Sequence, residues 1–384
     1  MYAVVLAGGG GTRLWPLSTP ECPKPFLRLI GDETLIQRTV ARLAPLVAPA
    51  DVYVVTDRRY LDLARSQLPA IPPANFLGEP MGRNTAAAVA LAAEAIARPA
   101  DEVMLVLPAD AHIADEAGLR TALAVAGEVA AGGSLVTMGV TPDRPETGYG
   151  YVLARRPARV VGGRETFAVD RFVEKPTVER ARELIASGLA SWNAGIFVWT
   201  RATVRDRLAR HAPEIVGPIR AICSSGGDED LDLAYPSLRA TSIDYAVMEP
   251  ASLEGAVAVV PMDVGWSDLG SWSALRDAWQ AAASRDEAAL APKVASGAVG
   301  TGNRRDLGSS ESLVLAGDRL VVTIGLRDII VVDAPEALLV CSAEHSQEVR
   351  GIAEEMARST AAAPAPMPAQ PLASPPGPTR ETRP

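Results

Sequence analysis

Four consecutive glycines, Gly8 to Gly11, follow an apolar run near the start of the chain, and Thr12 and Arg13 come directly after them. Glycine accepts positive φ angles and lets backbone N–H groups approach a phosphate chain closely. The segment does not match the P-loop motif G-x-x-x-x-G-K-[ST], because the chain has no Gly-Lys pair. It does not match the dinucleotide-binding motif G-x-G-x-x-G either, because the last glycine would fall on Arg13 or Leu14. Taken alone, it is either a phosphate-binding loop or a flexible turn.

Lysine is rare in this chain, whose 37 basic residues include only three lysines, at positions 24, 175 and 293. Lys24 is flanked by prolines and follows Arg13 closely in sequence. An arginine fork can bridge phosphate oxygens and a lysine supplies a compact charge, so this pair suits a triphosphate over the glycine loop. The alternative for Lys24 is a solvated surface charge, which the bias toward arginine disfavours. Lys293 matches no motif and is expected at the surface.

Two aspartates stand just after predicted strands. Asp110 follows the apolar run 103–107, and Asp268 lies in a turn-rich segment after another apolar run. Magnesium is typically held by one or two carboxylates together with substrate oxygens and water, so the two aspartates suit a Mg²⁺ site at the carboxyl ends of strands. The alternatives are a helix cap or Asx-turn for Asp110 and a simple turn residue for Asp268.

Glu174 and Lys175 stand directly before a proline. A carboxylate can bind a sugar hydroxyl and an ammonium can bind a phosphate, and the proline favours an extended backbone at Lys175 that turns the two side chains to opposite faces. A surface Glu-Lys pair at a strand end explains the segment equally well. Gly150 and Asn193 each stand in a turn-like segment and are, by themselves, ordinary turn residues.

The elements that position these residues are predicted from hydrophobic periodicity. Continuous apolar runs indicate buried parallel strands, and apolar residues at three- and four-residue spacing indicate helices. The predicted helices are residues 35–43 and 85–97, the second behind an N-cap at Asn84. Repeated alternation predicts an α/β, doubly wound sheet with its ligand at the carboxyl ends of the strands. The predicted strands are residues 3–7, 52–56, 103–107, 135–140, 195–200 and 256–261.

The alternation fades near residue 284, where we place a domain boundary. Beyond it, residues 312–315, 320–324, 329–332 and 337–341 form short β-type runs separated by turn-forming residues, and residues 345–358 suggest a closing helix. The last 26 residues contain eight prolines and little to bury, which predicts a disordered tail. The expected domains are therefore 1–283, a small β domain at 284–358, and a tail at 359–384.

Composition excludes several classes of protein. The 384 residues carry a net charge of -9, which argues against a nucleic-acid binder with a basic face. The three cysteines are far apart and give neither a disulfide framework nor a zinc spacing. The apolar start lacks a basic region, and no run approaches the length of a membrane span. We therefore expect a cytoplasmic enzyme with no membrane partner, in which a few local cations hold any anionic ligand.

These motifs together resemble the sugar-1-phosphate nucleotidylyltransferases, and specifically the mannose-1-phosphate guanylyltransferases, also called GDP-mannose pyrophosphorylases. Matches in the same order across most of the first 270 residues make the resemblance specific, whereas each motif alone is weak. One departure is that the family pattern Pro-x-Asp-His is here interrupted by Ala111, so we assign no role to His112. The matching segments are GGGGTRLWPLS, PKPF, GEPMGRNTA, LPAD, TGYGY, FVEKP, WNAGIFVW and GWSDLGSW.

The resemblance implies a Rossmann-like, doubly wound mixed sheet followed by a short β-helix-like domain. It also implies transfer of a nucleotidyl group from GTP to mannose 1-phosphate, with Mg²⁺ as cofactor, and it admits a homodimer. The catalytic residues would be Arg13, Lys24 and Lys175. The Mg²⁺ ligands would be Asp110 and Asp268. Gly150, Glu174, Lys175 and Asn193 would bind the sugar phosphate. The nucleotide would be bound by Leu6, Ala7, Gly8, Gly9, Gly10, Gly11, Thr12, Arg13, Lys24, Glu79, Arg83, Asn84 and Thr85.

Two alternatives to this function stay open. The assignment of guanine as the base and mannose as the sugar rests on the resemblance alone. The enzyme could therefore act on another nucleoside triphosphate or another hexose 1-phosphate. A non-catalytic sugar-nucleotide sensor with the same fold would be expected to lack some of the charged site residues that this chain retains. Longer relatives carry a cupin-type isomerase domain, for which we see no room after residue 284, and we expect no isomerase activity.

Overall fold

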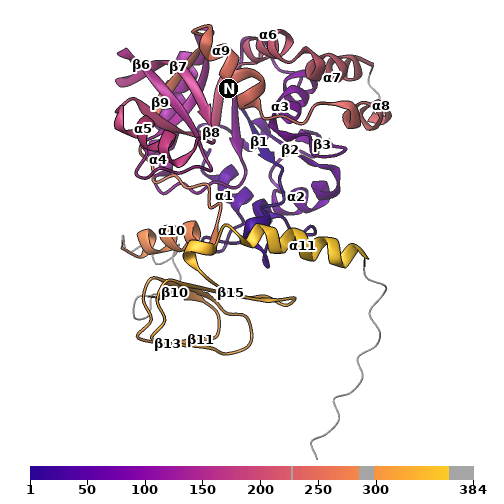
Figure 1. Cartoon of the computed structure of the whole chain (residues 1–384). Coiled ribbons are helices and arrows are strands. Elements are labelled where there is room, and N and C mark those ends of the chain that lie inside the picture. The colour runs from indigo at the N-terminus through magenta and orange to yellow at the C-terminus, as the bar shows by residue number, and fades with distance from the viewer. Residues whose placement is uncertain (226–227, 285–297, 363–384) are drawn as a thin grey trace, which may run out of the picture.

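The computed structural model describes residues 1–225, 228–284 and 298–362. Figure 1 shows a large α/β part built from the first three quarters of the chain and a smaller β part beneath it, with two helices, α10 (Trp272–Ser284) and α11 (Val349–Ala362), between them. Lys293 lies outside the described residues, and so does residue 363 onward of the predicted tail, 359–384; its first four residues, 359–362, instead belong to α11.

The large part is organised around a mixed sheet in the order β3-β2-β1-β4-β8-β5-β9-β7-β6. β1, β2, β3 and β4 pair in parallel, whereas β8 runs antiparallel to both β4 and β5. The mixed α/β architecture predicted from the sequence is confirmed. The strands are β1 (Tyr2–Ala7), β2 (Val52–Asp57), β3 (Phe76–Glu79), β4 (Val103–Pro108), β5 (Leu135–Val140), β6 (Gly150–Val161), β7 (Arg164–Glu174), β8 (Ala190–Thr200) and β9 (Val257–Met262).

Helices cover both faces of this sheet, which explains why its central strands are continuous apolar runs. Successive side chains of a strand point to opposite faces. Tyr2 and Val4 therefore lie in one hydrophobic core, and Ala3, Val5 and Ala7 lie in the other. None of the helices in the described ranges has the length and apolarity to cross a membrane. The helices of this part are α1 (Leu35–Ala41), α2 (Leu61–Gln67), α3 (Asn84–Ala95), α4 (Glu116–Ala131), α5 (Val178–Ala186), α6 (Arg201–His211), α7 (Pro213–Ser225), α8 (Asp228–Ala234) and α9 (Glu249–Leu253).

Helix α3 begins differently from the sequence prediction. Its N-cap is Arg83, which makes no side-chain capping bond, and Asn84 is the first helical residue with a φ of 67°. The Asn84 Oδ1 atom accepts a hydrogen bond from the N–H of Thr85 at 2.8 Å. Asparagine tolerates this left-handed conformation better than most residues because its short side chain can bond locally. Asn84 thus shapes the turn into α3 without serving as its N-cap.

The small part consists of short strands that stack in parallel as the chain winds. β10, β12 and β14 form one parallel row that β15 closes in antiparallel fashion, and β11 pairs with β13 in a second row. Such repeated parallel stacking is the arrangement of a short β-helix. The expected closing helix appears as a 3₁₀ turn, Ala343–His345, followed by α11. The strands are β10 (Ala298–Thr301), β11 (Arg304–Leu307), β12 (Ser312–Leu315), β13 (Val321–Ile324), β14 (Ile329–Asp333) and β15 (Leu338–Ser342).

A third hydrophobic core joins the small part to the start of the chain. Trp272 and Trp279 of α10 lie at its centre, and both are buried. The Trp272 indole N–H donates to the carbonyl of Trp15 at 3.0 Å, and the Trp279 indole N–H donates to the carbonyl of Leu29 at 2.8 Å. Its other buried members include Leu14, Leu29, Ile30, Leu35, Leu269, Val299, Leu313, Ile330, Val332 and Val349.

Candidate active site

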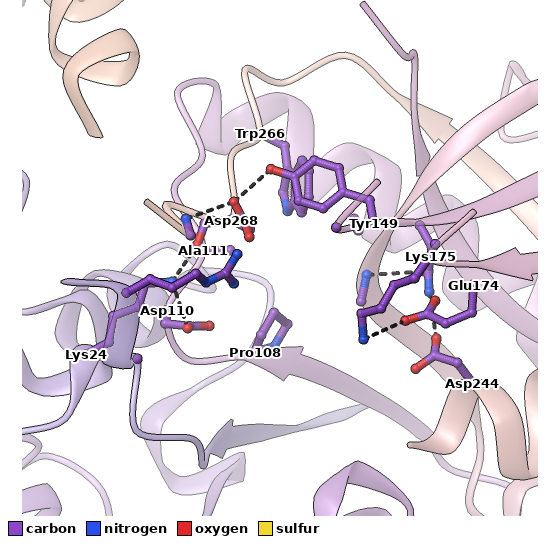
Figure 2. Close-up of a pocket in the computed structure, with 18 of the residues that line it drawn as sticks. Lys24, Pro108, Asp110, Ala111, Tyr149, Glu174, Lys175, Asp244, Trp266 and Asp268 are labelled. Atoms are coloured by element: carbon purple, nitrogen blue, oxygen red, sulfur yellow. Dashed lines mark hydrogen bonds and ion pairs between the residues drawn. The ribbon is translucent and has the colours of Figure 1, made fainter. Parts of the chain in front are cut away.

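A cavity of about 380 Å³ opens at the carboxyl ends of β1 and β4, where the sequence pattern predicted a ligand. Figure 2 shows Lys24, Asp110 and Asp268 on one side of it and Lys175, Glu174 and Asp244 on the other. We call these two groups the Lys24 end and the Lys175 end. Of the residues predicted from the sequence, Gly11, Arg13, Lys24, Asp110, Gly150, Glu174, Lys175, Asn193 and Asp268 line the cavity.

The glycine loop packs closely against the side chain of Lys24. Gly11 has a φ of 57°, and a side chain there would collide with the side chain of Lys24. By contrast, a Cβ atom built on Gly8 or Gly9 meets no heavy atom within 4 Å. The hydroxyl of Ser18 donates to the carbonyl of Gly10 at 2.5 Å and so fixes the loop from below. Glycine at position 11 is required by packing, whereas the exposed glycines before it leave open space above the backbone.

Lys24 is almost completely buried, with 4% of its surface exposed. Its ammonium donates to Asp110 Oδ2 at 2.8 Å and also to the backbone carbonyl of Asp268. A buried ammonium must be paired and hydrogen-bonded, because removing it from water is otherwise very costly. The sequence prediction that Lys24 is more than a solvated surface charge is therefore confirmed by its burial.

A short antiparallel bridge brings Asp110 and Asp268 to the same end of the cavity. The N–H of His112 donates to the carbonyl of Ser267 at 2.8 Å, and the N–H of Ser267 donates back to the carbonyl of His112 at 3.0 Å. The guanidinium of Arg42, which is buried, donates to the carbonyl of Ala111 at 2.9 Å and holds the same segment. The backbone of His112 thus joins the segment that carries Asp110 to the segment that carries Asp268.

The Asp268 carboxylate is oriented by its own turn and by Tyr149. Its Oδ1 atom accepts hydrogen bonds from the Tyr149 hydroxyl at 2.7 Å and from the N–H of Gly270 at 2.9 Å. Burial, followed by the charge of Asp268, raises the pKa of Tyr149 well above its ordinary value, so the phenol stays a hydrogen-bond donor. The TGYGY motif does not by itself assign a role to Tyr149, whose ring is held in place by edge-on contacts with Trp192 and Trp266.

The Lys24 end is chemically suited to a hard divalent cation such as Mg²⁺. Asp110 and Asp268 supply carboxylate oxygens, which this ion prefers, and it usually takes few protein ligands and completes its coordination with phosphate oxygens and water. No group of three or more His, Cys, Asp or Glu that could hold a metal occurs within residues 1–225, 228–284 and 298–362. The two aspartates would therefore need phosphate oxygens and water to complete the coordination of such an ion.

The Lys175 end is more open. The Lys175 side chain is 62% exposed, and its ammonium lies 3.3 Å from Glu174 Oε1. Lys175 has a φ of 46°, and its N–H donates to the carbonyl of Tyr149 at 3.2 Å. The expected extended backbone at Lys175 is therefore wrong, because this hydrogen bond holds it in the left-handed region. A Cβ atom at Gly150 would meet the Glu174 carboxylate, which would then have to move from its present position.

Asn193 is a hydrogen-bond hub at this end and is more than an ordinary turn residue. Its Nδ2 donates to Asp244 Oδ1 at 2.6 Å, and its Oδ1 accepts from Thr137 Oγ1 at 2.8 Å. Burial, and then the charge of Glu174, raises the pKa of Asp244 to about 6. Asp244 was not predicted from the sequence. The feature that could have identified it is an ionisable residue inside the apolar segment IDYAVM, which the structure places at a π-helical turn, Asp244–Met248.

The remaining predicted nucleotide-binding residues do not line this cavity. Arg83 donates to the carbonyls of Tyr235 and Pro236, at 2.9 and 2.6 Å. Glu79 is buried, accepts a hydrogen bond from the Tyr235 hydroxyl at 3.3 Å, and has its pKa raised to about 7 chiefly by burial. Thr85 Oγ1 accepts from the N–H of Ile243. Leu6, Ala7, Gly8, Gly9, Gly10, Thr12 and Asn84 also lie outside the lining.

Family models match both parts of the chain. The model described as nucleotidyl transferase matches residues 2–285, which is well over half of the chain. The model described as the MannoseP isomerase/GMP-like beta-helix domain matches residues 302–356. The second match agrees with the parallel stacking of β10 to β14 and confirms the predicted β-helix-like character of the small part.

Curated proteins and a solved structure are similar over most of the chain. Mannose-1-phosphate guanylyltransferase of Escherichia coli K12 is 38% identical, over 93% of this chain and 73% of that protein. Alginate biosynthesis protein AlgA of Pseudomonas aeruginosa is 39% identical, over 93% and 72%. The crystal structure of mannose-1-phosphate geranyltransferase from Thermus thermophilus superposes with a TM-score of 0.81 at 33% identity, over 93% of this chain and 99% of that one. This chain is therefore an enzyme of the nucleotidyl transferase family and belongs to its mannose-1-phosphate guanylyltransferase group.

Proposed function

We propose that this enzyme catalyses the reaction of GTP with α-D-mannose 1-phosphate to give GDP-mannose and diphosphate. The observation that carries the proposal is that one cavity holds two ammonium groups on opposite sides, Lys24 on one side and Lys175 on the other. Two phosphate-bearing substrates must meet in such a reaction, and each end offers one ammonium to one of them.

The proposed step is an in-line displacement at the α-phosphorus of GTP. A phosphate oxygen of the sugar phosphate forms a bond to that phosphorus. The bond from the phosphorus to the oxygen bridging toward the β-phosphate breaks, and its electron pair leaves with diphosphate. No proton, oxidant or reductant is required. Catalysis then consists mainly of positioning the two substrates and stabilising the charge that builds up on the leaving group.

At the Lys24 end, the triphosphate would lie over the exposed glycines with Arg13 and Lys24 directed toward it. Lys24 is held in advance by Asp110 and by the Asp268 carbonyl, so it needs little reorganisation to meet a developing negative charge. Asp110 and Asp268 would hold Mg²⁺. That ion supplies charge neutralisation on phosphate oxygens when it is bound. Tyr149 and the N–H of Gly270 keep the Asp268 carboxylate oriented.

At the Lys175 end, the ammonium would bind the phosphate of the sugar 1-phosphate and orient its attacking oxygen. Glu174 and Asn193 present acceptor and donor atoms for sugar hydroxyls, as the family resemblance implies. Asp244 is attached to Asn193 through a 2.6 Å hydrogen bond and fixes which way the amide points. The open position of Lys175 suits a substrate that must enter and then leave as part of a larger product.

The test is a turnover panel in which the purified full chain is given each nucleoside triphosphate with each hexose 1-phosphate, with and without Mg²⁺, and diphosphate release is measured. We expect the highest kcat/KM for GTP with mannose 1-phosphate, and activity only with the metal. A higher kcat/KM for another pair would reassign base or sugar while leaving nucleotidyl transfer intact. Absence of diphosphate release from every pair would contradict the proposal.

A further inference from the structure

The end of the small part reaches the Lys24 end of the cavity. Gln347 lies just before α11, and its Oε1 atom accepts a hydrogen bond from Arg13 Nη1 at 3.2 Å. The two residues are 334 positions apart in sequence. Within the described part of the chain, this is the one hydrogen bond or ion pair in which the Arg13 side chain takes part. The guanidinium that would meet the triphosphate is therefore held by a side chain from outside the nucleotidyl transferase match.

Gln347 stands on a segment that is firmly anchored. Ser346, its neighbour, is 1% exposed and shares a 3.0 Å hydrogen bond with Ser273 of α10. Ser273 in turn shares a 2.8 Å hydrogen bond with Ser271, which follows the Asp268 turn. On the other side of Gln347, Val349 is buried in the third core. An exposed glutamine between two buried residues has a fixed backbone, so its side chain can position a partner.

A small cavity of about 90 Å³ adjoins the main one at this point. Arg13, Tyr149, Asp268 and Gly270 line both cavities, and Gln347 lines the small one. The side chain of Gln347 thus approaches the same space that holds the metal-binding aspartate and the tyrosine that orients it. The small part of the protein contributes directly to the wall beside the triphosphate position.

We propose that Gln347 is a positioning residue for the nucleotidyl transfer reaction, which sets the direction of the Arg13 guanidinium toward the triphosphate. This inference rests on the proposed function at the same site. A guanidinium has five N–H donors, so one bond to Gln347 leaves the others available for phosphate oxygens. A neutral amide directs the guanidinium without cancelling its charge, whereas a carboxylate at this position would compete with the phosphates.

The experiment compares Gln347→Met with Glu348→Met in the full-length enzyme. Methionine keeps the length of glutamine but removes the oxygen acceptor, and Glu348 is an exposed neighbour that lines neither cavity, which makes it a matched control. We expect Gln347→Met to raise KM for GTP about three- to tenfold, the usual effect of losing one hydrogen bond, with KM for mannose 1-phosphate and thermal stability unchanged. Glu348→Met should leave all of these parameters unchanged.

A double-mutant cycle separates positioning from a general structural role. In an Arg13→Lys background the fork that Gln347 holds is gone, so adding Gln347→Met should have little further effect on KM for GTP. Equal effects of Gln347→Met in both backgrounds, or an equal loss with Glu348→Met, would overturn the inference. Normal GTP kinetics in Gln347→Met combined with a large loss in Arg13→Lys would also overturn it while leaving the proposed function in place. If Arg13→Lys is itself neutral, both the role of Arg13 and this inference fail.

Discussion

The two lysines at opposite ends of the cavity are held in opposite ways. Lys24 is 4% exposed and makes two hydrogen bonds that fix its ammonium before any ligand arrives. The Lys175 side chain is 62% exposed, and its ammonium is 3.3 Å from the carboxylate of the residue next to it. One end of the cavity is therefore prepared in advance, whereas the other must be organised by its substrate.

This difference fits what each end would do in the proposed reaction. Charge would develop there on the leaving diphosphate, and preorganised groups stabilise such charge best because they do not have to reorient during the reaction. The sugar phosphate would enter, react and leave within a product, so a looser cation would be sufficient. At the Lys24 end the ammonium pairs with the Asp110 carboxylate and donates to the backbone carbonyl of Asp268, whereas the Lys175 end gathers two carboxylates, Glu174 and Asp244, near one exposed ammonium.

The largest effect is expected at the prepared end, from Lys24→Met. The change removes the fixed cation and leaves Asp110 unpaired next to the triphosphate position. We expect kcat/KM to fall about a thousandfold, within the range seen when a preorganised transition-state donor is lost. Steady-state diphosphate release measures it. Arg28→Met removes an exposed cation from the same segment and should change kcat/KM little. Near-normal activity in a folded Lys24→Met variant would show that the prepared end is not catalytic.

A smaller and more selective effect is expected from Lys175→Met. Its ammonium is solvated and screened, so we expect KM for mannose 1-phosphate to rise about thirtyfold, with less than a threefold change in KM for GTP. The difference between variant and wild type should shrink as salt is raised, because an exposed charge is screened. Arg180→Met, which removes another exposed cation nearby in the sequence, is the control. Equal increases in the two KM values would mean that the ends do not bind separate substrates.

The smallest effect is expected from Asp244→Asn, and it concerns how the free energy of unfolding changes with pH. The pKa of Asp244 is raised to about 6 from an ordinary 3.8, so the folded state binds this proton more tightly than the unfolded state does. The contribution is therefore fully favourable below about pH 4 and is lost as pH rises to about 6. Relative to Asp244→Asn, the wild type should lose about 1 to 2 kcal/mol of unfolding free energy across that window.

Urea denaturation at several pH values from 4 to 7 measures this difference. Asparagine keeps an oxygen that can accept the hydrogen bond from Asn193, so the variant tests the charge and not the contact. Asp206→Asn, an exposed aspartate whose side chain is 74% exposed, is the matched control and should track the wild type. A free-energy difference between Asp244→Asn and wild type that does not change with pH would show that burial and the charge of Glu174 do not raise the pKa of Asp244 in the folded protein.

The sequence predicted the central strands of the sheet well and its peripheral ribbon poorly. β1, β4 and β5 are buried on both faces, so continuous apolar runs are enough to find them. β6 and β7 pair as an antiparallel ribbon in which buried residues are interspersed with exposed charged ones, so no continuous apolar run marks them. β11 was missed for the same reason, since its residues include two arginines and an aspartate.

The same contrast separates the site residues that were predicted from those that were missed. Lys24, Asp110 and Lys175 stand in local motifs whose composition is unusual, and local composition is visible in a sequence. Asp244 contacts Asn193, which is 51 positions away in the sequence, and Gln347 contacts Arg13, which is 334 positions away. No local sequence pattern marks either residue. The positions of Glu79, Arg83 and Thr85 outside the cavity also depend on contacts to the 235–243 segment, which a single motif does not reveal.

The third core has a consequence for the order in which the protein becomes active during synthesis. Leu14, which follows the glycine loop closely in sequence, shares that core with Val349 near the other end of the described chain. Domains emerge from the ribosome in order, and the first strand is made first. Yet the support beneath the glycine loop cannot be completed until the last coil of the small part and the start of α11 have been synthesised. The glycine loop, although it is made first, is thus among the last parts of the enzyme whose packing is completed.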